Sequence, residues 1–281
     1  MAFSSIVQLT GCAAPLWEAV LTADMTDRGV SREKSWGKME KLWLQMKATV
    51  AAYEPDTRSP SGLVGGEGAQ VLGGASRLCD PLLKEIIATA LKTGECNACM
   101  QRIVAAPTAG ASGVMPAVLI PLQRRDGFSD EAMVQALFVA AGFGQVIAHR
   151  ASISGAEGGC QAEIGSASAM AAAALVQLCR GSTKQMAEAV AMAITNLMGL
   201  VCDPVAGLVE VPCVKRNVIG AMNALSAAEM ALCGCTMPIP CDEVLDAMRA
   251  VGDALPETLR ETGRGGLAVT PTGERIAQEF L

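Results

Sequence analysis

Helix start and stop signals recur along nearly the whole chain, and they constrain its fold more than any other feature. Asp80 followed by Pro81 is an N-cap residue with proline at the first helical position, and Gly94 is expected just beyond the end of that helix. Ser129 predicts the start of another helix, which runs to Ala148. Alternating β-branched residues do not recur often enough to build a sheet. We therefore expect an all-α fold.

Further helices follow from the same signals. Ser182 and Gln185 form a capping box, and Pro212 is expected in the first turn of a later helix. Only 3% of the residues are aromatic although 51% are hydrophobic, so small aliphatic side chains must build a core in which helices pack closely. This apolar content also excludes intrinsic disorder. These helices are predicted to cover residues 160–180, 182–198, 212–232 and 242–251.

Charge and hydropathy exclude several classes of protein. The net charge of −6 and the isoelectric point near 5.0 argue against nucleic-acid binding, which needs a basic surface. The longest apolar run, residues 132–148, is interrupted by Gln135 and Gly142, so we interpret it as a buried helix and expect no membrane span. Residues 1–8 contain no Lys or Arg, which a signal peptide requires. We expect a cytoplasmic protein.

Cysteine and histidine counts narrow the possible chemistry. The chain has 11 cysteines and one histidine, His149, so a disulfide framework and a histidine-rich metal site are both disfavoured. Cys179 and Cys233 lie in apolar helical stretches and are predicted to be small core residues. Cys96 and Cys99 form a CxxC motif, but no second pair completes a zinc site.

Three other cysteines stand at predicted ends of helices. Cys160 follows two glycines and opens a helix, Cys202 follows a helix, and Cys213 lies in the first turn of the next one. Helix N-termini lower thiol pKa values and offer free N–H groups to an anion, which suits an iron–sulfur cluster. The spacings of 42 and 11 residues differ from those of compact ferredoxin motifs. The residues alone therefore leave two alternatives open, a three-cysteine cluster site and scattered buried thiols.

Loops of small residues connect the predicted helices, and they carry a family resemblance. None matches a nucleotide-binding fingerprint, and each could be a plain connection or a close approach of backbone to a ligand. The segments resemble signature segments of the α chain of the iron–sulfur-dependent L-serine dehydratases. They are residues 59–66 (SPSGLVGG), 106–116 (APTAGASGVMP), 152–163 (SISGAEGGCQAE), 199–217 (GLVCDPVAGLVEVPCVKRN) and 266–273 (GLAVTPTG).

The resemblance implies a fold, a cofactor and a partner. It implies a compact multi-helix catalytic domain over residues 1–281, with glycine-rich loops around a [4Fe–4S] cluster and with residues 1–30 as a peripheral N-terminal segment. The cluster would be held by Cys160, Cys202 and Cys213. Many members of the family carry a second domain or a separate β chain, so we expect a β subunit and an oligomeric enzyme.

The implied reaction converts L-serine to pyruvate and ammonia. Three thiolates for four irons would leave one iron open to act as a Lewis acid on the substrate hydroxyl, by analogy with zinc sites that keep an open position. A base removes the α-proton, and the resulting 2-aminoacrylate tautomerises to an imine that is hydrolysed. The sequence leaves two alternatives open, a related lyase acting on L-threonine or L-cysteine and a cysteine-rich redox or iron–sulfur sensor.

Candidate residues for binding the substrate and moving its proton lie in and near these segments. We expect backbone N–H groups and hydroxyls of the 106–113 loop to bind the substrate carboxylate, because such a loop before a helix forms an anion-binding nest. The base is left open. The candidate substrate-binding residues are Asn97, Thr108, Gly110, Ser112, Gly113 and Ser61, and the candidate catalytic residues are Ser154, Glu157 and Lys215, with Ser112, Glu163 and His149 as further candidates for the base.

Overall fold

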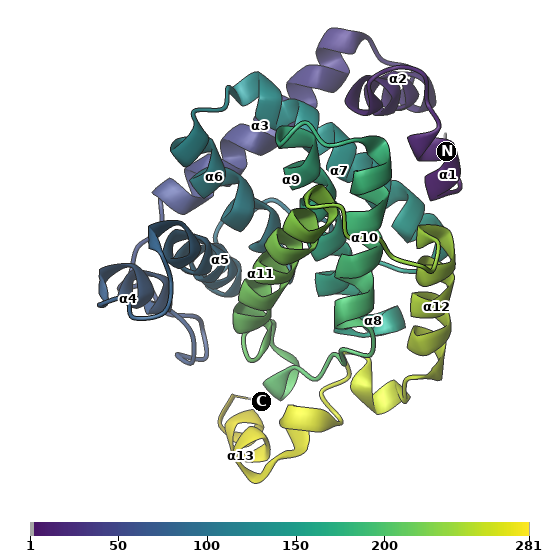
Figure 1. Cartoon of the computed structure of the whole chain (residues 1–281). Helices are drawn as coiled ribbons and strands as arrows, with labels where there is room; N and C mark the ends of the chain where they lie inside the picture. The colour runs from purple at the N-terminus through teal and green to yellow at the C-terminus, as the bar shows by residue number, and fades with distance from the viewer. Residues whose placement is uncertain (1–2, 281) are drawn as a thin grey trace.

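The computed structural model describes residues 3–280, and Figure 1 shows that helices and loops make up this part of the chain. Within it the β-structure is one isolated bridge between Cys202 and Arg260, so the all-α prediction is confirmed. The helices are α1 (Ile6–Thr10), α2 (Leu16–Arg28), α3 (Arg32–Ala51), α4 (Glu67–Gly73), α5 (Pro81–Ala98), α6 (Val114–Asp126), α7 (Asp130–Arg150), α8 (Gly155–Gly158), α9 (Ser166–Leu178), α10 (Thr183–Leu197), α11 (Cys213–Leu232), α12 (Cys241–Ala254) and α13 (Pro271–Phe280), with short turns η1 (Gln161–Gly165), η2 (Val205–Gly207), η3 (Glu257–Leu259) and η4 (Gly266–Val269).

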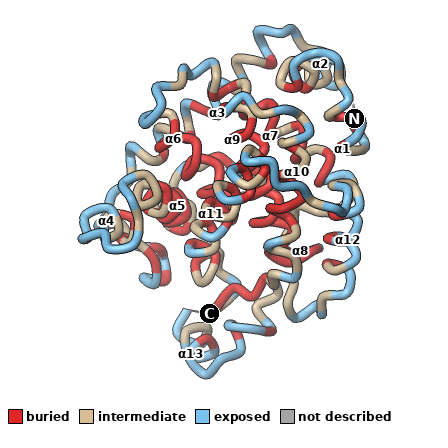
Figure 2. Tube along the Cα trace, viewed as in Figure 1, coloured by how far each residue is buried: buried red, intermediate tan, exposed pale blue. Residues whose placement is uncertain are grey.

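Helix α9 forms the centre of the fold. It packs against α7, α10 and α11, and residues 166–176 are all buried. In Figure 2 the buried colour accordingly concentrates where these helices meet. Most side chains of α9 are alanine or serine, so its neighbours can approach closely without leaving cavities. The small-residue composition therefore determines how the core is packed.

The predicted helix boundaries agree well with the structure where capping residues mark them. Ser129 caps α7, and the capping box of Ser182 and Gln185 is formed at the start of α10. The prediction that a helix ends before Gly94 was wrong, because α5 continues to Ala98. A Cβ at position 94 would lie 3.2 Å from Cγ1 of Val214, so this glycine serves close packing against α11.

The helix predicted from Cys160 contains a feature that its sequence did not reveal. Residues 161–165 form the π-helical turn η1, and the α-helix α9 begins only at Ser166. Single π-turns within helices occur frequently at functional sites because the extra residue re-aims nearby side chains. Here the turn follows Cys160 directly and contains Glu163.

Helix α7 is long and apolar enough to cross a membrane by length and composition, but it is a core helix. In its most apolar window 67% of the residues are buried inside the protein, as predicted for this run. The N-terminal helices α1 and α2 lie at one edge of the molecule (Figure 1), yet Leu9 and Leu21 are fully buried and belong to the same core. Gly142 of α7 allows α1 and α2 to pack closely against it, because a Cβ at that position would lie 2.6 Å from Cγ2 of Val20.

Removing a ring from this core should be costly. We predict that Phe143→Ala lowers the free energy of unfolding by about 3–5 kcal/mol, because the side chain is fully buried and its loss leaves a cavity. The matched variant Phe280→Ala, at a residue 42% exposed on α13, should change it by less than about 1 kcal/mol. Chemical denaturation followed by circular dichroism measures both, and equal losses would contradict this account of the core.

Candidate active site

The three cysteines at predicted helix ends lie in one buried site. Cys160 is the N-cap of η1 and Cys213 is the first residue of α11, whereas Cys202 lies in the extended segment that pairs with Arg260. Their exposed fractions are 1%, 7% and 2%, respectively. The ligand atoms of Cys160, Cys202 and Glu163 lie within 4.8 Å of one another. The Cys213 thiol is close enough to interact electrostatically with those of Cys160 and Cys202.

Backbone hydrogen bonds hold the segment that carries Cys202. Its N–H donates to the Leu259 carbonyl and its carbonyl accepts from the Glu261 N–H, both at 2.8 Å. On the other side of the thiol, a Cβ on Gly155 would lie 3.0 Å from Sγ of Cys202. A glycine is thus needed where α8 approaches this sulfur.

A buried arginine connects two of the three cysteine segments. Nη1 of Arg216 donates to Sγ of Cys160 at 3.3 Å and to the Val201 carbonyl at 2.8 Å, and Nη2 lies 2.7 Å from Oδ1 of Asp203. The two side chains of the ion pair are only 11% and 5% exposed. Oδ2 of Asp203 also accepts from the N–H of Leu267 at 2.8 Å, which ties η4 to the site.

The electrostatics of the thiols differ from the expectation for helix starts. The neighbouring Cys202 thiol and the Arg216 guanidinium hold the pKa of Cys160 below its ordinary value. Burial, however, raises the pKa of Cys213 to about 12. The pKa of Cys202 is also raised, because it hydrogen-bonds to Cys160 and is buried. The prediction that a helix start lowers the thiol pKa was therefore wrong for Cys213, where burial dominates.

Two carboxylates face the thiols. Glu163 is 9% exposed, its Oε1 accepts a hydrogen bond from the Thr108 hydroxyl, and burial raises its pKa. A Cβ on Gly155 would lie 3.2 Å from Oε2 of Glu261 and 3.4 Å from Oε2 of Glu163. Both carboxylates therefore reach the space beside Gly155, next to Cys202. Sequence reasoning included Glu163 only among further candidates and missed Glu261. No motif marks Glu261, but its φ of 62° is a left-handed conformation of the kind found at functional sites.

Asn217 joins the 106–113 loop to the first turn of α11. Its Oδ1 accepts from the Gly113 N–H at 2.8 Å, and its Nδ2 donates to the carbonyls of Gly110 at 2.8 Å and Cys213 at 3.0 Å. A Cβ on Gly110 would lie 2.7 Å from Oε1 of Glu163, so this loop also needs its glycine. The Ser112 hydroxyl is buried without a hydrogen-bond partner among the described residues. The loop therefore lies against Glu163 and offers an unused donor.

The two remaining predicted binding residues are Ser61, in the 59–66 loop, and Asn97, on α5. The hydroxyls of Ser61 and Ser59 donate to Oε2 of Glu210, which is buried and precedes Cys213 by three residues. Ser61 thus supports the segment before α11. Asn97 is half-buried on α5, three residues after Gly94, and shares the face that packs against α11.

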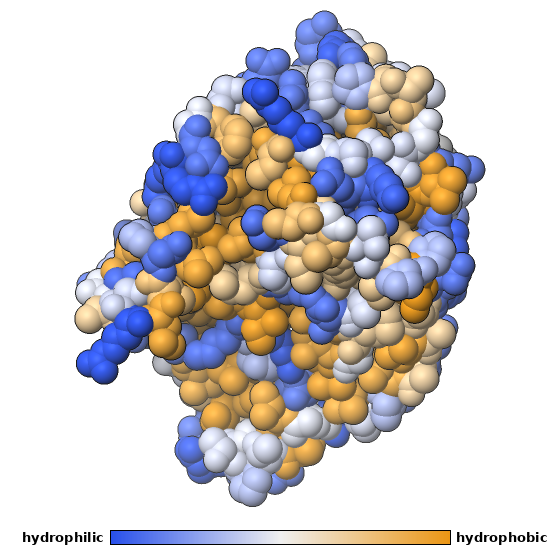
Figure 3. Space-filling view, in the orientation of Figure 1, coloured by the Kyte–Doolittle hydropathy of each residue, from blue (hydrophilic) through white to orange (hydrophobic). Residues whose placement is uncertain are grey.

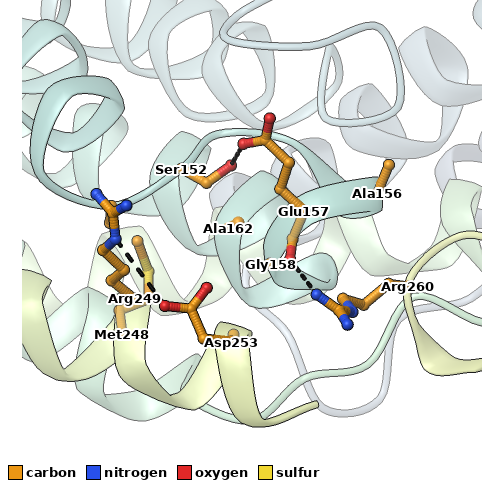
Figure 4. A pocket seen from close by; sticks show the side chains of 11 residues that line it. Ser152, Ala156, Glu157, Gly158, Ala162, Met248, Arg249, Asp253 and Arg260 are labelled. Carbon is orange, nitrogen blue, oxygen red and sulfur yellow. Dashed lines mark hydrogen bonds and ion pairs between the residues drawn. The ribbon is translucent and has the colours of Figure 1, made fainter. Parts of the chain in front are cut away.

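Two of the three candidate catalytic residues have their side chains elsewhere than at the thiols, whereas Ser154 directly precedes Gly155, which lies against Cys202. Lys215 is 64% exposed and its ammonium lies 2.8 Å from Oε1 of Glu67, so it belongs to a surface ion pair. Glu157 accepts from the Ser152 hydroxyl at 2.7 Å and lines a cavity on the side of α8 that faces α12 (Figure 4). Ser154 is the N-cap residue of α8, and its carbonyl accepts a hydrogen bond from the Gly158 N–H at 3.0 Å.

The remaining cysteines discussed above and His149 lie outside the thiol site. Cys179 and Cys233 are both exposed, so the prediction that they are core residues was wrong; each follows the last turn of a helix. The CxxC pair lies at the end of α5, where Cys96 is buried and Cys99 is half-buried. His149 is exposed at the end of α7.

Fold and site together define a helical protein with a buried, cysteine-rich site whose ligand atoms are close enough together to hold a metal ion. A family model of the serine dehydratase alpha chain matches residues 13–268. The chain belongs to this family.

Comparison with individual proteins agrees with that assignment. The chain is 46% identical over 267 residues to a probable L-serine dehydratase, alpha chain, of Bacillus subtilis (strain 168), covering 94% of this chain and 89% of the relative. It is 56% identical over 200 residues to a probable L-serine dehydratase, alpha chain, of Latilactobacillus sakei, covering 71% and 96%. The L-serine dehydratase TdcG of Escherichia coli (strain K12) is 44% identical over 182 residues, but the match covers only 40% of that protein.

The buried ion pair of Arg216 and Asp203 should contribute far more to the free energy of unfolding than the surface pair of Lys215 and Glu67. We predict that Arg216→Met lowers the free energy of unfolding by about 3–5 kcal/mol, because it leaves Asp203 charged and buried without its partner. Lys215→Met, one residue earlier, removes an exposed pair and should cost less than about 1 kcal/mol. Urea denaturation of the metal-free protein compares the two variants, and similar losses would contradict a stabilising role for the buried pair.

Proposed function

We propose that this chain is the α chain of an L-serine dehydratase that converts L-serine to pyruvate and ammonia. The observation that carries the proposal is the convergence of the buried thiols, the Glu163 carboxylate and the 106–113 loop in one site. The curated relatives that carry the name L-serine dehydratase support the choice of reaction and substrate.

A [4Fe–4S] cluster is the proposed cofactor, held by Cys160, Cys202 and Cys213. The donor set fits, because cysteine thiolates are the usual ligands of such clusters and the Arg216 guanidinium supplies positive charge beside Cys160. Gly155 leaves the space beside Sγ of Cys202 free of a side chain. When bound, the cluster would supply a Lewis acid for the departure of the substrate hydroxyl.

The 106–113 loop is the proposed binding site for the substrate carboxylate. The Ser112 hydroxyl is buried with no partner among residues 3–280, and leaving such a donor unsatisfied costs about 1–3 kcal/mol. A carboxylate oxygen would satisfy it. Thr108, whose hydroxyl donates to Glu163, would then orient the base and line the same site.

Glu163 has the strongest support among the candidates for the base. A general base must lie within reach of the proton that it removes and must have a pKa near the working pH. Burial raises the pKa of Glu163, and its Oε2 faces the space beside Gly155. In the proposed reaction this oxygen takes the α-proton as hydroxide departs, giving 2-aminoacrylate. Tautomerisation to the imine and hydrolysis then release pyruvate and ammonia.

A β subunit is the proposed partner. Three relatives are named alpha chains, and the match to the longer Escherichia coli relative covers only 40% of that protein. On the face drawn in Figure 3, hydrophobic residues reach the surface between hydrophilic ones. Several large apolar residues are exposed, including Ile219 at 51% and Val269 at 47%.

Activity on amino acids tests the proposed function directly. We expect anaerobically prepared protein, loaded with iron and sulfide and supplied with a β chain of the family, to form pyruvate from L-serine faster than 2-oxo acid from L-threonine or L-cysteine. Exposure to air should abolish this activity, and iron with a thiol reductant should restore it. Lack of turnover under all these conditions, or a preference for L-threonine or L-cysteine, would contradict the proposal.

Substitutions in the loop test the proposed substrate contacts. Ser112→Ala should raise KM for L-serine about tenfold or more, because it removes a hydrogen bond to a charged group, while circular dichroism should remain unchanged. Ser226→Ala, the same change at an exposed position of α11, should leave KM within about twofold. An unchanged KM in Ser112→Ala would place carboxylate binding elsewhere.

A further inference from the structure

A cavity lies beside the short helix α8, and none of the three thiol residues lines it. It has a volume of about 400 Å³, and α8 and η1 line it opposite α12. Figure 4 shows Glu157, Arg249, Asp253 and Arg260 around it. A cavity of this size accommodates a small organic molecule. Nothing in the proposed dehydratase mechanism uses it.

The charged groups of this cavity are unequally paired. Arg249 has Asp253 as an ion-pair partner at 4.0 Å, and the carboxylate of Glu157 accepts from the Ser152 hydroxyl at 2.7 Å. Among the described residues, the guanidinium of Arg260 makes only a long hydrogen bond, 3.5 Å, from Nη1 to the Glu157 carbonyl. Its Nε is buried and has no hydrogen-bond partner among the described residues. One guanidinium in the wall is therefore left without a carboxylate, and its buried N–H is unsatisfied.

The segment that carries Arg260 also holds the thiol site. Arg260 forms the β-bridge with Cys202, and the residues on either side of it make the two hydrogen bonds to the Cys202 backbone. The next residue, Glu261, extends its carboxylate toward the thiols, whereas Arg260 lines the cavity. A ligand on Arg260 would consequently act on the same short stretch of backbone that positions Cys202 and Glu261.

We propose that this cavity binds a small carboxylate through Arg260 and that occupancy stabilises the pairing of the 259–261 segment with Cys202. A guanidinium presents a planar fork of N–H groups that matches a carboxylate. The Arg260 guanidinium calls for a negatively charged group on the ligand, and the Glu157 carboxylate, whose partner is the Ser152 hydroxyl, tolerates a positively charged group on the same molecule. Nearby hydroxyl and carboxylate groups of Ser152 and Asp253 suit a molecule that also carries a polar group, such as a short oxo, hydroxy or amino acid.

Calorimetry on the full-length chain tests the binding. Pyruvate, acetate, L-serine and inorganic phosphate serve as separate probes. We expect at least one of the carboxylates to bind saturably and Arg260→Gln to weaken that binding about tenfold or more, since a charge-assisted bidentate contact is lost. Arg275→Gln, which removes an exposed arginine of α13, should leave the affinity within about twofold. Ser112→Ala, at the proposed substrate loop, should leave the Arg260-dependent binding intact.

A gain of charge within the cavity provides a second variant that does not remove a wall residue. Ala156 is exposed and lines the cavity, so Ala156→Glu should supply an internal carboxylate to Arg260 and prevent binding, with an unchanged circular dichroism spectrum. In the wild type, the bound carboxylate should slow hydrogen exchange at the amides of Cys202 and Glu261. This readout does not depend on dehydratase activity, so it remains interpretable if the proposed function fails.

Three outcomes would overturn the inference. The first is that none of the three carboxylates binds at millimolar concentration. The second is that binding persists in both Arg260→Gln and Ala156→Glu, or that exchange at Cys202 and Glu261 is unaffected by the ligand. The third is that phosphate alone binds in an Arg260-dependent manner, which would make the cavity a site for a different anion.

Discussion

The site depends above all on the buried ion pair of Arg216 and Asp203. Arg216 is the fourth residue of α11, and it reaches the sulfur of Cys160 and the backbone before Cys202. Asp203 in turn receives the backbone N–H of Leu267. One desolvated pair thus connects segments far apart in the sequence. Burying either charge without its partner would cost free energy, so the position of each segment depends on the other.

Close packing of small residues makes this arrangement possible. The core around α9 leaves little room for large side chains, and the helices that carry the site approach one another at glycines. Gly94 brings α5 against α11, and Gly110 brings the substrate loop against Glu163. Gly155 does the same for α8 and Cys202. The glycine-rich loops therefore have a steric role that their sequences alone left undecided between connection and binding.

Much of the fold could be predicted because helix boundaries are local. Ser129, Ser182 and Pro212 each mark the start of a helix through hydrogen bonds or backbone angles of nearby residues. Gly94 misled the prediction, because the reason for that glycine lies in the partner helix. The π-turn after Cys160 was missed for a similar reason, since no residue type specifies it locally.

The site was predictable only in part. Cys160, Cys202 and Cys213 stand in distinctive local segments, and the structure places them together. Glu261 and Asn217 act through contacts with residues remote in sequence, so no local pattern marks them. Lys215 is near Cys213 in sequence, but the direction of its side chain on the helix takes it to Glu67 at the surface.

Cys160, Cys202 and Cys213, and no other cysteines, are the proposed ligands of the cluster. The iron and sulfide content of anaerobically reconstituted protein, together with its visible charge-transfer absorption, tests this proposal. We predict that wild type and the Cys96→Ala/Cys99→Ala double variant bind iron and sulfide equally, and that Cys160→Ala, Cys202→Ala and Cys213→Ala each lose them. Retention of the cluster in Cys213→Ala together with its loss in the double variant would contradict it.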